Sequence, residues 1–313
     1  MRVLRGLHAL TRVPRRTVVT VGMFDGVHLG HQRLIRRTVG LAKQLRGTSV
    51  VMTFDPDPQQ VLDPDHAQPR LMPLKERVRL IKALGAELIW IMPFTRRFAQ
   101  CSAEQFVQRI LLRQLQASCV VVGKNFAFGK ARRGNLQLLR ALGQPHGMRV
   151  VVVPPVLRGK KPVSSSRIRR LVQQGQLEQV RRLLGRPFQL SGRVVRGEGR
   201  ARQLGFPTAN LRLKDAWLPP RGVYHVRLER AGRPLHGLMN LGVRPTFLAQ
   251  TDGSAPLVCE VHLVGFRRNL YGRPMTIAVL KRLRAEKRFE TSEALVRQIR
   301  QDLRRAHLVS RPS

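Results

Sequence analysis

The stretch that decides the first part of the fold is VVTVGMFDGVHLGH, residues 18–31. It begins with the β-branched run Val18 to Val21, which predicts a buried strand. A turn with glycines follows and leads into a helical pattern from His31 to Leu45. A strand, such a turn and a helix N-terminus present backbone N–H groups to a bound anion, so the stretch predicts a phosphate site.

The side chains of this turn are candidates for chemistry. His28 and His31 lie three residues apart at the expected start of the helix, where both imidazoles can reach one phosphate chain. Imidazoles in that place can stabilise the charge that develops during phosphoryl or nucleotidyl transfer. The predicted phosphate-binding residues of the turn are Gly22, Phe24, Asp25, Gly26 and Gly30.

Strands and helices alternate through the first half of the chain. Beyond the opening stretch we predict strands at 48–54, 88–92, 119–122 and 149–153, and amphipathic helices at 73–84 and 103–114. This alternation is typical of a parallel, doubly wound α/β sheet. Two short helices, 165–173 and 177–184, follow before the pattern changes near residue 185.

The second half consists of short strand-like segments broken by Gly and Pro. These segments are 189–195, 222–230, 235–242, 257–264 and 275–283. Their spacing suggests an antiparallel barrel or sandwich. An amphipathic helix, 292–306, closes the chain, with Leu295, Ile299 and Leu303 on its inward face.

Two further motifs suit bound phosphates. The run SSSRIR, residues 164–169, places hydroxyls and arginines at a helix N-terminus and reads either as an anion site or as a helix cap with solvated arginines. The run GEGRARQLGFPTAN, residues 197–210, is a Gly- and Arg-rich loop suited to a polyphosphate. Thr208 and Asn210 share one side of an extended segment, which suits Mg²⁺ held together with phosphates, although PTAN alone could be a plain turn.

The composition limits the possible partners. Among 313 residues, Lys plus Arg total 58 and Asp plus Glu total 18, a net charge of +40, which raises a nucleic-acid hypothesis. The arginines are spread along the whole chain and aromatic residues make up only 5%, so we expect salt-sensitive sticking to polyanions and no specific nucleic-acid partner. No apolar run is long enough to cross a bilayer, so no membrane association is expected.

The cysteines and the N-terminus bear on the compartment. Cys101, Cys119 and Cys259 form neither a CxxC pair nor a zinc pattern, and we expect reduced thiols in a cytoplasmic protein. The first residues lack the apolar core of a secretory signal, but they are Arg-rich and poor in acids, as transit peptides are. The sequence does not give the oligomeric state.

Four stretches resemble one known family. GMFDGVHLGH (22–31), VVVGKNFAFGKARRGN (120–135) and SSSRIR (164–169) are similar to the adenylyltransferase part of the bacterial bifunctional riboflavin kinase/FAD synthetase. The run 197–210 resembles the signature of riboflavin kinase. The resemblance implies an α/β nucleotidyltransferase domain, 1–185, followed by a mainly antiparallel β-barrel kinase domain, 186–313, with a C-terminal helix.

In the first domain the resemblance implies that FMN attacks the α-phosphate of Mg²⁺-bound ATP, giving FAD and pyrophosphate. His28 and His31 would hold the ATP phosphates and stabilise the transition state. The residues implied to grip pyrophosphate are Ser164, Ser165, Arg167 and Arg169. The residues implied in the flavin and nucleotide pocket are Asn125, Phe126 and Phe128, which without the family would be a turn with two buried aromatics.

In the second domain the resemblance implies phosphorylation of riboflavin to FMN by ATP. Glu260 would be the general base for the ribityl 5′-hydroxyl, and Thr208 and Asn210 would hold Mg²⁺. Gly197, Gly199 and Arg200 would contact the ATP phosphates. Arg282 and Arg284 would lie on the flavin side.

Some residues depart from the family pattern. Met23 replaces a usual Asn, Ala201 replaces a common Gly, and Asp57 adds a carboxylate that would repel a nearby polyphosphate unless it faces solvent or a metal. The departures at Asp57 and Met23 leave open an enzyme in which only the kinase half is active. The arginine content leaves open a nucleic-acid-binding protein on the same scaffold.

Overall fold

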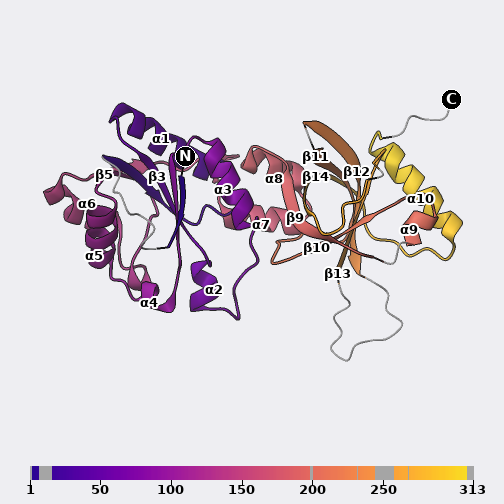
Figure 1. The fold of residues 1–313 in the computed structure, drawn as a ribbon, viewed down its shortest axis with the longest axis horizontal. Helices are drawn as coiled ribbons and strands as arrows, with labels where there is room; N and C mark the ends of the chain where they lie inside the picture. The colour runs from indigo at the N-terminus through magenta and orange to yellow at the C-terminus, as the bar shows by residue number, and fades with distance from the viewer. Residues whose placement is uncertain are drawn as a thin grey trace. The chain divides into compact units, whose positions relative to one another are not determined.

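The computed structural model describes residues 2–6, 16–197, 200–230, 232–243, 257–266 and 268–308 (Figure 1). The chain divides into two compact units, Met1–Ser165 and Ser166–Ser313. Each unit has its own sheet and its own hydrophobic core. This division places the helices at 165–173 and 177–184 almost entirely in the second unit.

The first unit contains a six-stranded parallel sheet in the order β1-β4-β3-β2-β5-β6. Its strands are β1 (Arg2–Arg5), β2 (Thr17–Val21), β3 (Ser49–Phe54), β4 (Leu88–Met92), β5 (Ala117–Gly123) and β6 (Arg149–Val153). From β2 the chain adds β3 and β4 on one side and then crosses back to β5 and β6 on the other. Ligands of such sheets bind at the carboxyl ends of the strands where this switch occurs, here β2 and β5.

Helices pack on both faces of this sheet. The α-helices of this unit are α1 (Leu29–Gln44), α2 (Pro58–Leu62), α3 (Leu74–Ala83), α4 (Arg96–Ala99), α5 (Ala103–Gln105) and α6 (Leu136–Gly143). One core cluster joins Trp90 of β4 to Phe106 and to Leu139 of α6, and a second joins Ile89 of the same strand to Ile35 of α1. Neighbouring strand residues therefore face opposite cores, which confirms the doubly wound α/β prediction.

Several elements differ from the predictions. The helix predicted at 103–114 is present, but Phe106–Gln114 winds as a π-helix. Strand β1 and helices α2, α4 and α6 were not predicted. Arg2–Arg5 lies within the N-terminal residues whose composition resembles a transit peptide, yet it pairs in parallel with β4.

Asp57 is the N-cap of α2. Its carboxylate accepts a hydrogen bond of 2.9 Å from the Gln59 N–H, and the Gln60 side chain accepts one of 3.2 Å from the Asp57 N–H. This reciprocal pair is a capping box. The added carboxylate therefore has a local structural role in starting a helix.

A short hairpin and two helices follow the parallel sheet. They are β7 (Leu157–Arg158), β8 (Lys161–Pro162), α7 (Ser165–Gln173) and α8 (Leu177–Leu184). Both helices have the bounds that the sequence predicts.

The second half is a closed barrel in the order β10-β13-β12-β11-β14-β9, in which every neighbouring pair is antiparallel. Its elements are β9 (Phe188–Val195), α9 (Arg200–Gln203), β10 (Ala209–Leu213), β11 (Gly222–Arg230), β12 (Arg233–Val243), β13 (Leu257–Leu263), β14 (Pro274–Arg284) and α10 (Ser292–Arg305). Leu303 and Ala306 of the C-terminal helical segment pack on Val223 of β11 and Leu238 of β12. The barrel and the terminal helix are confirmed, whereas β10 was not predicted.

Candidate active sites

The turn between β2 and α1 has an unusual backbone. Phe24 has φ +52°, Gly26 φ +84° and Val27 φ +36°. A positive φ is rare outside glycine and costly for a β-branched residue such as Val27. Strained backbone of this kind persists only where the surrounding structure holds it, and it clusters at functional sites.

The two histidines stack at the start of α1. His28 is the N-cap, and its Nδ1 accepts a hydrogen bond of 3.3 Å from the His31 backbone N–H. The two ring centroids are 3.6 Å apart and the rings are 20° from parallel. A Cβ on Gly30 would lie 3.1 Å from the His28 ring, so the glycine leaves room for that ring. The predicted meeting of the two imidazoles at the helix mouth is thus present.

The environment of His31 favours a neutral ring. Burial, then the neighbouring His28 and then the Arg77 guanidinium lower the pKa of His31 well below 6.5. Within the described part of the chain, its Nδ1 is buried and has no hydrogen-bond partner. A buried, unpartnered ring nitrogen costs free energy unless water or a ligand satisfies it. His31 is therefore suited to hydrogen bonding with a bound group.

Asp25 connects the turn to two other segments. Its carboxylate is 4% exposed, and both oxygens accept from the Leu71 N–H at 3.1 Å. Its backbone carbonyl accepts a 2.9 Å hydrogen bond from the hydroxyl of Ser165, the first residue of α7. The structure thus brings Ser165 to the histidine turn. Asp25 acts there as an anchor of the turn.

The other predicted phosphate residues have varied surroundings. Ser164 and Arg167 are half-buried. Arg169 lies with its guanidinium carbon 5.6 Å from the centre of the Trp217 ring, and its carbonyl accepts from the Trp217 indole N–H at 2.9 Å. Part of Arg169 therefore packs inside the second unit, and its contact with pyrophosphate stays a prediction.

The predicted flavin loop follows β5, at the switch point of the sheet. Asn125 is exposed, Phe126 is half-buried, and Phe128 is 7% exposed. The rings of Phe126 and Phe128 stack with centroids 5.3 Å apart, and Phe128 also packs 5.6 Å from Phe106 in the core. Asn125 and Phe126 remain accessible to a ligand. Phe128 lies in the core and packs against the Phe126 ring.

One residue near the histidine turn escaped the sequence analysis. Arg77 of α3 is 1% exposed and donates to the carbonyl oxygens of Met23 and Phe54, at 2.6 and 3.1 Å. The sequence does indicate a buried arginine here, because Arg77 shares a helix face with the apolar residues Leu74, Val78 and Ile81. A charged residue on an apolar helix face requires buried partners.

The predicted kinase residues gather on one face of the barrel. Asn210 of β10 pairs in register with Glu260 of β13, which pairs in register with Asn240 of β12. Residues paired across a sheet project to the same face. Asn210 is 9% exposed, Thr208 and Glu260 are half-buried, and Thr208 and Asn210 lie two residues apart as expected.

A cavity of about 590 Å³ lies beside these residues. Gly197, Thr208 and Asn210 line it together with Arg202 and Tyr271. A Cβ on Gly197 would lie 2.1 Å from Nδ2 of Asn210, so only glycine allows this close approach. The cavity is large enough for a nucleotide.

Two other features of this loop are settled by the geometry. His262 is hydrogen-bonded to the Pro207 carbonyl at 2.9 Å and packs edge to face on Phe206, which braces the turn before Thr208. Ala201 is helical within α9 and is not among the residues with positive φ, so an alanine fits this position without backbone strain. Gly199 and the side chain of Arg200 lie outside the described residues.

Hard oxygen donors suit Mg²⁺ at this place. The Thr208 hydroxyl and the Asn210 amide line the cavity, and the Glu260 carboxylate lies on the neighbouring strand. In the described part of the chain, no three His, Cys, Asp or Glu side chains gather closely enough to hold a metal ion. Two neutral oxygen donors and one carboxylate fit a cation that takes most of its ligands from water and substrate phosphates.

The two predicted flavin-side arginines differ. Arg282 donates to the Arg221 carbonyl at 2.6 Å. Arg284 is bound through Nε and Nη2 to the carboxylate of Asp302 in α10 and through Nη1 to the Ala285 carbonyl. Arg284 thus fastens α10 to β14, and its contact with the flavin stays a prediction.

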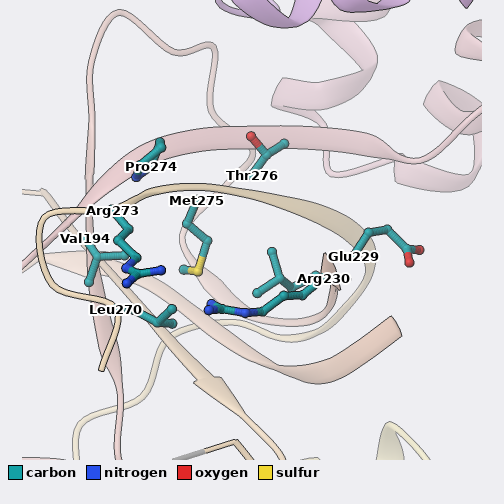
Figure 2. A pocket seen from close by; sticks show the side chains of 9 residues that line it. Val194, Glu229, Arg230, Leu270, Arg273, Pro274, Met275 and Thr276 are labelled. Carbon is teal, nitrogen blue, oxygen red and sulfur yellow. The ribbon is translucent and has the colours of Figure 1, made fainter. Parts of the chain in front are cut away.

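A second cavity, of about 520 Å³, shares Val194 and Leu270 with the first. Figure 2 shows the guanidinium groups of Arg230 and Arg273 directed into it, while the Glu229 carboxylate points away. Glu229 is paired with Arg227 at 2.8 Å. No predicted site residue lines this cavity.

The fold and the two sites define a two-part transferase that acts on nucleotides, with a nucleotidyltransferase-like unit and a barrel unit. Comparison with known proteins agrees: the FAD synthetase family matches residues 10–167 and the riboflavin kinase family matches residues 184–309. The chain belongs to the family of bifunctional riboflavin kinases/FMN adenylyltransferases and has the domain for each activity.

Relatives with this name span the whole chain. The Pseudomonas fluorescens protein is 38% identical over 313 residues, covering 100% of this chain and 99% of its own. The proteins of Escherichia coli K12 and of Buchnera aphidicola from Schizaphis graminum are 34% and 32% identical, with 96% and 97% of each chain covered. The sequence similarity to these relatives therefore extends over both units.

One solved structure has the same fold throughout. It is a Streptococcus pneumoniae protein described as a macrolide-efflux protein, with a TM-score of 0.85 and 29% identity, covering 98% of this chain and 99% of its own. That description belongs to the Streptococcus protein. Among the described residues here, no helix is long and apolar enough to cross a membrane.

Proposed function

We propose that the first unit performs adenylyl transfer at the β2–α1 turn. A phosphate oxygen of FMN attacks the α-phosphorus of ATP, a new P–O–P bond forms, and the α–β bond breaks to release pyrophosphate. The observation that supports this site is the stacked pair His28 and His31 at the N-terminus of α1, with an unpartnered buried nitrogen on His31. Imidazole N–H groups there donate hydrogen bonds to the phosphate oxygens on which charge develops.

The residues around the histidines complete this proposed site. Backbone N–H groups of the turn and the positive end of α1 bind the polyphosphate. Ser165, whose hydroxyl donates to the Asp25 carbonyl, receives the leaving pyrophosphate. Asn125 and Phe126, at the neighbouring switch point, form the side of the pocket that orients the flavin.

The second unit phosphorylates riboflavin in our proposal. Glu260 accepts the proton of the ribityl 5′-hydroxyl as that oxygen bonds to the γ-phosphorus of ATP and ADP leaves. Gly197, without a side chain, approaches Asn210 closely where both residues line the cavity, and Thr208 and Asn210 hold Mg²⁺. When bound, Mg²⁺ neutralises phosphate charge. FMN, the product of this reaction, is the substrate of the first unit.

The test is a pair of matched variants of the full chain. In each, FMN and FAD are followed by chromatography with riboflavin and excess Mg²⁺-ATP. His28→Ala should lose FAD formation and keep FMN formation, because the two reactions use separate sites. Glu260→Gln should lose FMN formation and still convert supplied FMN to FAD. If both variants lose both activities while folded, the division of labour is wrong.

The same time course addresses the alternatives. FMN that accumulates without FAD in the unmodified chain would mean that only the kinase half is active. No turnover of either flavin would favour the nucleic-acid-binding alternative. Asp57 caps α2, and the Met23 backbone carbonyl accepts hydrogen bonds from Thr53 and Arg77, which supports a working first half. A cytoplasmic location stays a prediction.

A further inference from the structure

Arg77 is buried next to the proposed adenylyl-transfer site. Its side chain is only 1% exposed, and it is among the largest almost fully buried side chains in the part of the chain that the structure describes. Its Nη1 donates to the Met23 carbonyl at 2.6 Å, and its Nη2 donates to the Phe54 carbonyl at 3.1 Å. Burying a guanidinium is costly unless it forms strong hydrogen bonds. Here those bonds tie α3 to the carboxyl ends of β2 and β3.

The Met23 carbonyl is held from two sides. Besides Arg77, the hydroxyl of Thr53 donates to it at 3.2 Å. Met23 immediately precedes the part of the turn in which Phe24 and Val27 take positive φ. Because such backbone persists only when its surroundings hold it, the bonds at Met23 help to fix the path that leads to His28 and His31.

We propose that Arg77 is a positioning residue for adenylyl transfer, whose buried guanidinium fixes the β2–α1 turn and keeps a positive charge beside His31. This inference rests on the proposed function of that turn. Arg77 touches backbone carbonyls rather than substrate, so it acts through the histidines and through the backbone N–H groups of the turn.

The surroundings of Arg77 keep it charged at neutral pH. Burial and then Arg70 lower its pKa, while Asp25, Asp55 and Asp57 raise it, giving a pKa of about 10. Its charge in turn acts on His31, which also faces the ring of His28 and the edge of Phe24. Loss of the charge at position 77 should make His31 easier to protonate.

The experiment compares Arg77→Met with Arg77→Lys in the full chain. We expect Arg77→Met to lower kcat for FAD formation by about 10²-fold, with a smaller change in KM for ATP, because displacement of a positioned group costs that much. The acid limb of its pH profile should move to higher pH. Arg77→Lys retains the charge, so its acid limb should stay near the wild-type position while kcat recovers in part.

Matched controls come from the same chain. FMN formation from riboflavin reports on the second unit and should be unchanged in every variant. Arg70→Gln removes a nearby guanidinium that binds Asp55 and Gln60 but leaves Met23 untouched, so FAD formation should stay near the wild-type rate. If Arg77→Met unfolds the first unit, Thr53→Val removes the other donor to Met23 and should still lower kcat in a folded protein.

The results that would overturn the inference are distinct. The inference fails if Arg77→Met is folded and its kcat and pH profile for FAD formation are unchanged. It also fails if the rate of Arg77→Met falls only in proportion to the folded fraction and the acid limb does not shift. Unchanged kcat in Thr53→Val would also contradict it. If His28→Ala keeps FAD formation, the proposed site itself fails; if His28→Ala loses it and Arg77→Met keeps it, only the inference about Arg77 fails.

Discussion

The ion pair between Arg284 and Asp302 gives a quantitative prediction about stability. The Asp302 side chain is 1% exposed and that of Arg284 is 10% exposed. Nε of Arg284 lies 3.1 and 2.9 Å from the two carboxylate oxygens, and Nη2 lies 2.9 Å from one of them. Replacing Arg284 by Met leaves the carboxylate buried on α10 without this partner.

The size of the loss follows from that burial. Removing one member of a buried ion pair costs about 3–5 kcal/mol, because the remaining charge stays desolvated. A unit of this size unfolds in urea with a slope of roughly 2 kcal/mol per M. The urea midpoint of the second unit should therefore fall by roughly 2 M in Arg284→Met. The double variant Arg284→Met/Asp302→Leu also removes the unpaired buried carboxylate. It should recover most of the stability that Arg284→Met loses.

Trp217 offers a probe for this unit, because its indole N–H is bonded to the Arg169 carbonyl. Its fluorescence can be followed in urea in a Trp90→Phe background, which removes the tryptophan of the first unit. Arg300→Met, on the exposed side of α10, is the matched control and should change stability by less than about 0.5 kcal/mol. A loss of under about 1 kcal/mol in Arg284→Met would refute the claim that the pair anchors α10.

Three further predictions concern the two sites. Gly197→Ala would place a Cβ 2.1 Å from the Asn210 amide, so FMN formation should fall by about 10²-fold while supplied FMN is still adenylylated; equal rates would contradict the close approach. Because the folded state holds the pKa of His31 below 6.5, it binds fewer protons than the unfolded state, and the first unit should lose stability as pH falls below about 6.5; His31→Gln should flatten this dependence in urea unfolding. Excess EDTA should stop both reactions and Mg²⁺ restore them, and Asn210→Ala should raise the Mg²⁺ concentration needed for FMN formation alone; turnover in excess chelator would count against the metal assignment.

Local patterns were enough to predict much of the parallel sheet. The sequence shows the apolar runs of β2 and β4 and the amphipathic spacing of α3. These patterns can be read because the burial of side chains follows the period of the strand or helix that carries them. Strand β1 was missed because its four residues, Arg2–Arg5, become a strand only by pairing with β4, more than eighty residues away. Strand β10 was missed for the same reason, since it pairs with β9 and β13 to close the barrel.

The site shows the same division. His28, His31, Thr208 and Asn210 are predicted as site residues because their spacing within one segment indicates phosphate and metal chemistry. The role of Arg77 depends on the carbonyl oxygens of Met23, in the turn after β2, and of Phe54, at the end of β3. The role of Arg284 depends on a helix that follows later in the chain. Such roles are defined by tertiary contacts, which spacing along one element does not reveal.

The contrast between an open sheet and a closed barrel has a consequence for solubility. An edge strand presents unpaired N–H and C=O groups that can recruit another chain and begin aggregation. The barrel has no such edge, but β1 and β6 border the parallel sheet. The exposed Arg2 and Arg5 near the two ends of β1 oppose strand addition by charge repulsion. Closure thus protects one half of the enzyme from self-association, and charge protects the other, so high salt should promote aggregation through the adenylyltransferase half first.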